Sequence, residues 1–258
     1  MSLPGIKFKL WPSRSFHLDI NCTRLKLDDG KTQLRVRLEP CIKPGTLSAE
    51  DVERLRKALE QLQPQRPIKD CRLDITLSDA FSRCWILPRL EGIANPAELD
   101  ALAQHQLQTV FGYNADEAKQ WVVRYDATPF AASWPAIALP RILLDVCEEY
   151  TNKNDALTGT TSTRFTQQIN QLGLLSAAHR IIRKPLILVH STDDCVSIGI
   201  KRGVNWLSLR VHPSLKCLDL PLEKLLSRDC RAIGLTLAEC TVQSLDQPVR
   251  KHHHKVAA

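Results

Sequence analysis

Two strand–turn–strand patterns contain the polar side chains with the clearest potential for chemistry. Residues 71–88 alternate apolar and polar positions, which places Asp74 on a strand and Asp79 in the turn after it. Residues 185–203 repeat this pattern around a second polar turn. Carboxylates at such turns can bind Mg²⁺ or act as acids and bases when a nucleotide lies nearby. Because both aspartates occupy ordinary turn and strand positions, we expect them to face solvent instead.

The second turn holds the residue types of a serine hydrolase, namely His190, Ser191, Asp193 and Asp194. The sequence has no G-x-S-x-G elbow to present the serine as a nucleophile. Ser, Thr and Asp also shape turns by bonding neighbouring backbone groups, which explains these residues more simply. We therefore predict no catalytic residue. A Cys–His pair stays open among nine cysteines and eight histidines, although nothing in their spacing selects one.

A loop that cradles phosphate needs glycine, because its amides must approach the oxygens without an intervening Cβ. The ten glycines of the chain form neither G-x-G-x-x-G nor G-x-x-x-x-G-K-[ST]. The turns within 77–81 and 189–195 contain no glycine at all. We therefore expect no nucleotide cofactor, and we expect side chains such as Phe81 or Thr192 to occupy the place of the phosphate.

Metal chemistry has one candidate in the sequence, the run His252–His254. Three adjacent imidazoles can bind a transition metal, but the neighbouring Lys251 and Lys255 favour a solvated basic tail, native or artificially added. Cysteines at 22, 41, 71, 84, 147, 195, 217, 230 and 240 are odd in number and form no C-x-x-C pair. This pattern favours buried reduced thiols over disulfides or zinc. We predict no metal site.

Composition predicts a substantial core, and the distribution of charge is compatible with an anionic partner. The 258 residues, 43% of them hydrophobic, suffice for one large or two small domains. No stretch approaches the ~20 apolar residues of a transmembrane helix and no signal peptide is visible, so we expect a cytoplasmic protein. The net charge of +7 is carried by residues 1–45 and 179–258, which suits a nucleic acid, an anionic inner-leaflet surface or an acidic protein. A solvated face without a partner is an equal alternative, and an aromatic content of 5% speaks against nucleic acid.

The elements that position these residues alternate between strands and helices. Asp29-Gly30 marks a turn in an antiparallel meander within residues 5–45, and Ser48 with Asp51 marks a helix start. Beyond the two hairpins, the sequence predicts helices at 48–62, 95–111, 141–151, 163–172 and 222–233, and strands at 120–125, 136–139, 204–211 and 236–242.

Four pieces of residues 70–140 form a recognisable series. They are a strand ending in Leu77-Ser-Asp79, a return strand ending in Leu87-Pro88, a helix ending in Phe111-Gly112 and the strand Trp121-Val-Val-Arg-Tyr125. This series resembles bacterial proteins related to PilM, the actin-fold cytoplasmic subunits of type IV pilus assembly, and is similar to the cytoplasmic domain of the type II secretion protein GspL. From residue 165 to 242 the likeness is one of element order.

The resemblance implies an α/β, actin-like (ribonuclease H-like) fold with duplicated subdomains and mixed sheets, plus an N-terminal meander and helix. Actin-fold ATPases hold the β- and γ-phosphates between two hairpins whose turns are of the D-x-G type. The corresponding stretches here, 74–79 and 191–195, lack the glycine. What the resemblance then implies is a scaffold that does not hydrolyse ATP.

The resemblance further implies a cytoplasmic subunit peripheral to the inner membrane. Its partner would be the cytoplasmic segment of a pilus or secretion membrane protein, an assembly motor, or both, and the basic ends would suit anionic lipid. No partner-contact residue can be assigned, because no contact motif matches position by position. Two alternatives stay open: an ATP-binding actin-like ATPase with diverged loops, and a basic nucleic-acid-binding protein.

The expected domain organisation follows from these patterns. Residues 152–162 hold almost nothing that can be buried, so they are expected to separate two subdomains. The expected parts are 1–67 (N-terminal meander and helix), 68–152 (first actin-like subdomain), 153–162 (linker), 163–246 (second actin-like subdomain) and 247–258 (basic tail).

Overall fold

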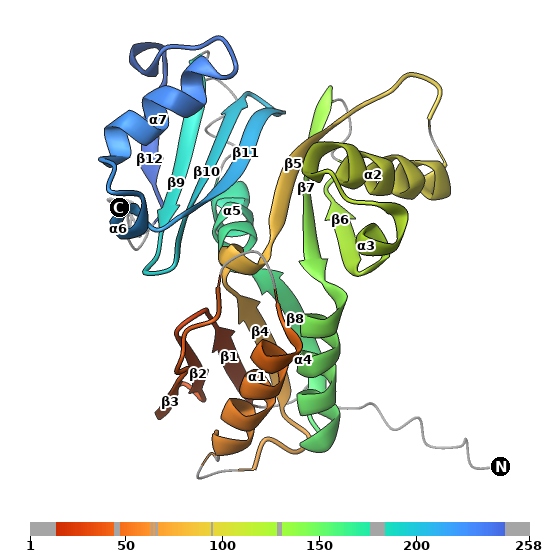
Figure 1. Ribbon diagram of the computed structural model, residues 1–258, viewed down its shortest axis with the longest axis vertical. Helices are drawn as coiled ribbons and strands as arrows, with labels where there is room; N and C mark the ends of the chain where they lie inside the picture. Colours follow the sequence, from red (N-terminus) through yellow and green to blue (C-terminus); the bar gives the residue numbers. More distant parts are fainter. Residues whose placement is uncertain are drawn as a thin grey trace, which may run out of the picture. The chain divides into compact units, whose positions relative to one another are not determined.

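The computed structural model contains two compact units (Figure 1). The described residues are 14–43, 47–62, 64, 67–93, 95–127, 131–175 and 184–245, without the side chains of 171–175 and 217. The first unit draws on residues within 1–81, 120–122 and 139–164, and the second on residues within 82–119, 123–138 and 165–258. The predicted basic tail, with His252–His254, lies outside the described residues.

A five-stranded mixed sheet forms the centre of the first unit. β1 (Ser15–Ile20), β2 (Arg24–Asp28) and β3 (Gln33–Arg37) form an antiparallel meander; β4 (Arg72–Leu77) is parallel to β1, and β8 (Leu157–Thr163) is parallel to β4. The resulting order is β3-β2-β1-β4-β8. Two helices, α1 (Ala49–Gln61) and α4 (Arg141–Lys153), lie side by side (Figure 1), joined by the ion pairs Arg56–Glu149 and Glu60–Lys153.

Alternating apolar and polar residues give this sheet two different faces. The strand register aligns Leu18 with Leu27 and with Ile75, and their side chains are 0%, 2% and 3% exposed. Successive strand residues point to opposite faces, so the other face carries polar side chains such as Asp19 and Asp74. Helices α1 and α4 contribute buried apolar stripes at helical spacing, which are Val52, Leu55 and Leu59, and Leu143, Val146 and Cys147.

Local signals explain where α1 begins. The Ser48 Oγ accepts a hydrogen bond from the Asp51 backbone N–H (3.1 Å), and the Asp51 carboxylate accepts one from the Ser48 N–H (2.9 Å). This capping box satisfies donors that the first helical turn leaves unpaired. The predicted start of this helix is confirmed.

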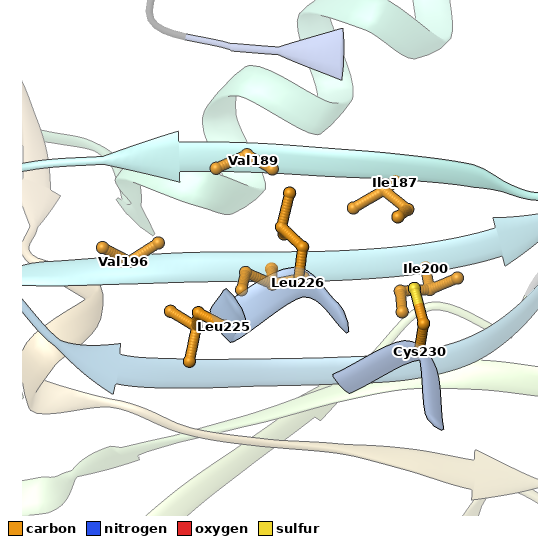
Figure 2. Close-up of a cluster of buried hydrophobic side chains, with 8 residues drawn as sticks. Ile187, Val189, Val196, Ile200, Leu225, Leu226 and Cys230 are labelled. Carbon is orange, nitrogen blue, oxygen red and sulfur yellow. The ribbon is translucent and has the colours of Figure 1, made fainter. Parts of the chain in front are cut away.

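A four-stranded sheet lies in the second unit. β9 (Leu186–Ser191), β10 (Cys195–Arg202) and β11 (Asn205–Pro213) form an antiparallel meander, and β12 (Thr241–Ser244) is parallel to β9, in the order β11-β10-β9-β12. The helices α6 (Leu215–Leu218) and α7 (Leu222–Arg231) follow β11. α7 buries Leu225, Leu226 and Cys230 against branched side chains of β9 and β10 (Figure 2), namely Ile187, Val189, Val196, Ile198 and Ile200.

Another core cluster in the second unit involves α5 (Arg164–Leu175). Its Phe165 packs with Trp206 of β11, and the two rings meet at Gly199 of β10. A Cβ at residue 199 would lie 2.6 Å from the Cζ3 atom of Trp206 and 2.9 Å from the Cζ atom of Phe165. This position therefore requires glycine because two aromatic rings approach the strand backbone.

The second unit also holds most of a small three-stranded sheet. Its strands are β5 (Arg83–Pro88), β6 (Trp121–Tyr125) and β7 (Ser133–Pro140), in the order β5-β7-β6, accompanied by α2 (Pro96–Phe111) and α3 (Ala115–Lys119). Asn95 caps α2 and Gly112 ends it in the left-handed region (φ 70°), which confirms the predicted helix. None of the helices in the described part of the chain is long and apolar enough to span a membrane.

The strand orders reveal an internal duplication. β3-β2-β1-β4 of the first unit and β11-β10-β9-β12 of the second have the same order and the same relative directions. The predicted duplicated actin-like α/β fold is thus confirmed, as is the hairpin within 185–203. The predicted hairpin at 71–88 is wrong, because β4 pairs with β1 and β8 whereas β5 pairs with β7, with the 3-10 turn η1 (Asp79–Phe81) between them. The true counterpart of β9–β10 is β1–β2.

Two further expectations differ from the structure. Residues 153–162, expected as a linker, contain the end of α4 and most of β8, an edge strand rich in β-branched threonine that needs little burial. The N-terminal meander, which the expected organisation listed as a separate part with helix 48–62, belongs to the same sheet as β4 and β8. The strand expected at 236–242 begins only at Thr241, because a capping box between Thr236 and Glu239 holds the 3-10 turn η3 (Leu237–Glu239).

Candidate functional site

The duplicated hairpins place two turns in equivalent positions. The turn between β1 and β2 comprises residues 21–23, and the turn between β9 and β10 comprises residues 192–194. Each follows the first strand of its meander, which is the kind of hairpin turn at which the resemblance to actin-fold ATPases implies phosphate binding. Sequence reasoning identified the second turn and missed the first, which it assigned to the N-terminal meander.

In the first turn, the side chain of Asn21 occupies the backbone donors. Asn21 is 4% exposed, and its Oδ1 accepts hydrogen bonds from the backbone N–H groups of Thr23 (2.9 Å) and Arg24 (2.7 Å). The Thr23 hydroxyl donates a third bond to the same oxygen (3.0 Å). A phosphate bound at this turn would need these amides as donors. The Asn21 side chain already accepts the hydrogen bonds of both amides.

The carbonyl groups of the same turn are also engaged. The N–H of Ile42 donates to the Cys22 carbonyl and that of Leu38 to the Thr23 carbonyl, both at 2.8 Å. Leu38 and Ile42 are 2% and 1% exposed, so the segment after β3 packs firmly against the turn. The conformation of the turn is therefore fixed from within the first unit and needs no ligand to order it.

The second turn is closed by Thr192. Its N–H donates to the Cys195 carbonyl (2.8 Å), and its Oγ1 accepts from the Cys195 N–H (3.2 Å). The same hydroxyl donates to the Asp194 Oδ1 (2.6 Å). These bonds show that Thr192 shapes the glycine-free turn, whereas the expectation that its side chain occupies the place of a phosphate stays a prediction. They engage the threonine and the aspartate as turn residues, in line with the turn interpretation of residues 190–195.

A carboxylate precedes the first turn and is paired with an internal cation. Asp19-Ile20-Asn21 leads from β1 into this turn, and the resemblance to actin-fold ATPases would imply a D-x-G sequence at such a turn. The Asp19 Oδ2 accepts a hydrogen bond from the guanidinium of Arg164, and the two side chains are 16% and 21% exposed. The Asp19 Oδ1 is buried and has no hydrogen-bond partner among the described residues. Arg164 thus supplies the positive charge that a metal ion would otherwise bring to a carboxylate in this position.

The aspartates that sequence reasoning selected have other environments. Asp74 accepts hydrogen bonds from Arg72 (Nη2, 2.9 Å) and from the backbone and hydroxyl of Thr160 (both 2.8 Å). Partial burial raises the pKa of Asp74, but these hydrogen bonds outweigh burial and lower it overall. Asp79 is 1% exposed, so the expectation that it faces solvent is wrong.

The turn after β4 is closed by its own serine. The Ser78 Oγ accepts from the Ala80 N–H (3.1 Å) and the Ser78 carbonyl from the Phe81 N–H (3.2 Å). Phe81 is 2% exposed and belongs to the core, as its apolar ring requires.

The cysteines and histidines add no metal centre among the residues that the structure describes. In that part of the chain, no group of three His, Cys, Asp or Glu side chains is arranged to hold a metal ion. Burial raises the pKa of the Cys147 thiol to about 12, so it stays protonated at neutral pH. The Sγ atoms of Cys230 and Cys240 lie 4.0 Å apart.

Comparison with known proteins agrees with this fold. No protein-family model and no curated protein matches the sequence. Among solved structures, the chain is similar to one described as the PilM-PilN type IV pilus biogenesis complex (TM-score 0.51, 12% identity, 85% of this chain and 71% of that one). It is also similar to a Bacteroides thetaiotaomicron protein with an actin-like ATPase fold and unknown function (TM-score 0.50, 9% identity, 93% and 94% covered). The chain therefore has an actin-like fold, and its predicted likeness to PilM is confirmed at the level of the fold.

Proposed function

We propose that this protein is a non-catalytic, actin-like scaffold subunit of a bacterial envelope machine, either a type IV pilus or a secretion platform. Its role would be to dock the cytoplasmic segment of a membrane protein, an assembly motor, or both. The actin-like fold supports this proposal, together with its similarity to a protein described in a PilM-PilN complex. A bacterial, cytoplasmic location at the inner membrane is part of the same proposal, and the excess of basic residues suits the anionic surface there.

The main observation in favour of a non-catalytic protein is that the backbone amides of the first turn are already hydrogen-bonded. Phosphoryl transfer depends on positioned donors that stabilise the phosphate oxygens. Asn21 satisfies the amides of Thr23 and Arg24 internally, with donor–acceptor distances of 2.9 and 2.7 Å. To bind phosphate, the turn would have to break these bonds in a site that is 4% exposed. Nucleotide binding would therefore work against the folded conformation of the turn.

The pairing of Asp19 with Arg164 supports the same proposal. A magnesium ion near Asp19 would have to displace a guanidinium that is already bound to its carboxylate. Both partners are largely buried, so removing one would leave the other charge uncompensated. In the first unit, the guanidinium of Arg164 thus takes the place of a metal cation, and the Asp19 carboxylate needs no metal ion to balance its charge.

The experiment has two parts. Isothermal titration of the full chain with Mg-ATP should show no binding up to millimolar nucleotide. The matched variant Asn21→Gly with Arg164→Gln opens the turn and frees the carboxylate, and it reports whether these two residues are what prevents binding. Micromolar Mg-ATP binding by the unaltered protein would instead establish the alternative, an ATP-binding actin-like ATPase.

The partner is tested by affinity capture of the full chain from a bacterial membrane extract. Inner-membrane components of a pilus or secretion system should be retained at moderate salt, and an unrelated protein of the same net charge should not retain them. Recovery of nucleic acid with a steep loss of affinity between low and moderate salt would favour the basic nucleic-acid-binding alternative. Recovery of neither would contradict the scaffold proposal.

A further inference from the structure

A buried carboxylate gathers three basic side chains at one edge of the sheet in the second unit. Asp229 of α7 is 0% exposed. Its Oδ2 accepts a hydrogen bond from the His212 Nε2 (2.7 Å), and its Oδ1 accepts one from the Arg210 Nη1 (3.4 Å). His212 and Arg210 lie two residues apart on β11, so they point to the same face. The Nε of Arg228 lies 3.9 Å from the Oδ1 of Asp229.

The hydrogen bonds run outward from this carboxylate as a chain. The Arg228 Nη2 lies 3.4 Å from the His212 Nδ1, and a guanidinium can only donate. The Nδ1 must then accept, which assigns the ring hydrogen to Nε2, where it bonds Asp229. The three basic side chains are thus held in fixed positions relative to one another, rather than moving independently on the surface.

The arginines are anchored at one end and exposed at the other. The side chains of Arg210 and Arg228 are 42% and 53% exposed, whereas that of Asp229 is 1% exposed. Among the described residues, the Nε and Nη2 of Arg210 have no hydrogen-bond partner. Two guanidiniums therefore present donors to solvent with their orientation already fixed, which is the arrangement that recognises the oxygens of a phosphoryl group.

The surroundings add positive charge. Lys224 and Arg231 are exposed and lie four residues before and three residues after Arg228 on α7, so they share its side of the helix. The acidic residues of α7 are Asp229, which is buried, and Glu223 in the first turn. One cation would be enough to neutralise Asp229, but the site contains two arginines, so it keeps a net positive charge.

From this geometry we propose that Arg210 and Arg228, positioned by Asp229 and His212, form a binding site for a phosphoryl group. Its source is either the headgroup of an anionic phospholipid or a free phosphate. The inference is independent of the scaffold role, because it rests on α7 and β11 and not on the two hairpin turns. A headgroup would in addition place this face of the second unit against a membrane.

The test compares two charge-matched variants of the full chain. Arg210→Gln with Arg228→Gln removes the proposed donors. Arg35→Gln with Arg37→Gln removes two exposed arginines from β3 and leaves the site intact. Association is measured by co-sedimentation with phosphatidylcholine vesicles with and without phosphatidylglycerol, and by isothermal titration with inorganic phosphate. Thermal unfolding checks that each variant folds. If the Arg210/Arg228 double variant does not fold, the single variant Arg228→Gln takes its place.

We expect the Arg210/Arg228 variant to bind about 30-fold more weakly, the loss that follows from removing two cations next to an anionic surface. The β3 variant should weaken binding by no more than about threefold, because only general attraction is reduced. Binding to vesicles that depends on phosphatidylglycerol assigns the site to a headgroup, and binding to inorganic phosphate alone assigns it to free phosphate. An equal loss in both variants, or no binding in either assay, would overturn the proposal.

Discussion

Replacing Asn21 by alanine tests the claim that this side chain, and not glycine, shapes the first hairpin turn. The substitution removes one acceptor for two backbone amides and one hydroxyl, at distances of 2.9, 2.7 and 3.0 Å. A net contribution of about 1 kcal/mol is typical of each hydrogen bond, and a buried donor left unpaired costs more. The Thr23 hydroxyl can rotate toward water, so the two amides account for most of the effect. We expect the free energy of unfolding to fall by about 2 to 3 kcal/mol.

Urea denaturation followed by circular dichroism measures this change. Asn21→Asp is the matched control, because it keeps Oδ1 as an acceptor, and it should remain within about 1 kcal/mol of the unaltered protein. Thr23→Ala removes the hydroxyl together with the γ-methyl group but leaves both backbone amides bonded to Asn21, and it should cost about 0.5 kcal/mol. If Asn21→Ala lowered the stability by less than about 0.5 kcal/mol, the turn would not depend on this side chain, and the argument against phosphate binding would lose its main support.

Three further changes follow from the structure. Tyr150→Phe should leave the free energy of unfolding unchanged or raise it by up to about 1 kcal/mol, because burial raises the pKa of Tyr150 to about 12 and its hydroxyl has no partner among the described residues; a clear loss in urea denaturation would reveal a missed bond. Gly199→Ala should lower the melting temperature and cost about 1 to 3 kcal/mol, since the new methyl group would overlap Trp206; an unchanged melting temperature would show that the ring moves aside. Burial raises the pKa of Asp74, but hydrogen bonds from Arg72 and Thr160 lower it by more, so the net shift of the pKa is downward. The stabilisation that the Asp74 carboxylate contributes to the fold is therefore complete at neutral pH and is lost below about pH 4. Asp74→Asn should therefore flatten the acid limb of the stability curve, and an unchanged slope would contradict this assignment.

Local signals predicted much of the secondary structure. Ser48 with Asp51, and Asn95 with Gly112, mark helix ends that depend on neighbouring residues alone, and both helices form where these signals place them. The β9–β10 hairpin was also predictable, because its two strands pair with each other across a short turn.

Pairing between distant strands was not predictable in this way. The segments 72–77 and 83–88 alternate like the arms of a hairpin, but each pairs with strands far away in the sequence, β1 and β8 for the first and β7 for the second. Periodicity shows which residues face a core, and it carries no information about which strand lies alongside. The expected hairpin at 71–88 was wrong for this reason.

The same limitation hid the first turn. Asp19 lies at the end of β1 and Asn21 in the turn after it, where no glycine marks the turn, and the partner of Asp19, Arg164, is 145 residues away in the sequence. A strand whose end runs into Asp19-Ile20-Asn21, followed by Cys22, Thr23 and a second alternating strand, was the available signal. It becomes informative only when the strand is seen to be equivalent to β9. The Asp229 cluster was hidden similarly, because its members lie 17 and 19 residues from that carboxylate on a different element.

The path of the chain through the first unit limits how this protein can be dissected. α4 and β8 belong to the first unit but follow the segment that builds α2 and most of the small sheet. The five-stranded sheet of the first unit is therefore completed by residues more than 75 positions beyond β4. A fragment ending near residue 81 would leave the edge of β4 unpaired and the apolar stripe of α1 without α4. Such a fragment should aggregate, and proteins prepared for binding studies should instead lack residues 82–119 and 123–138 or keep the chain whole.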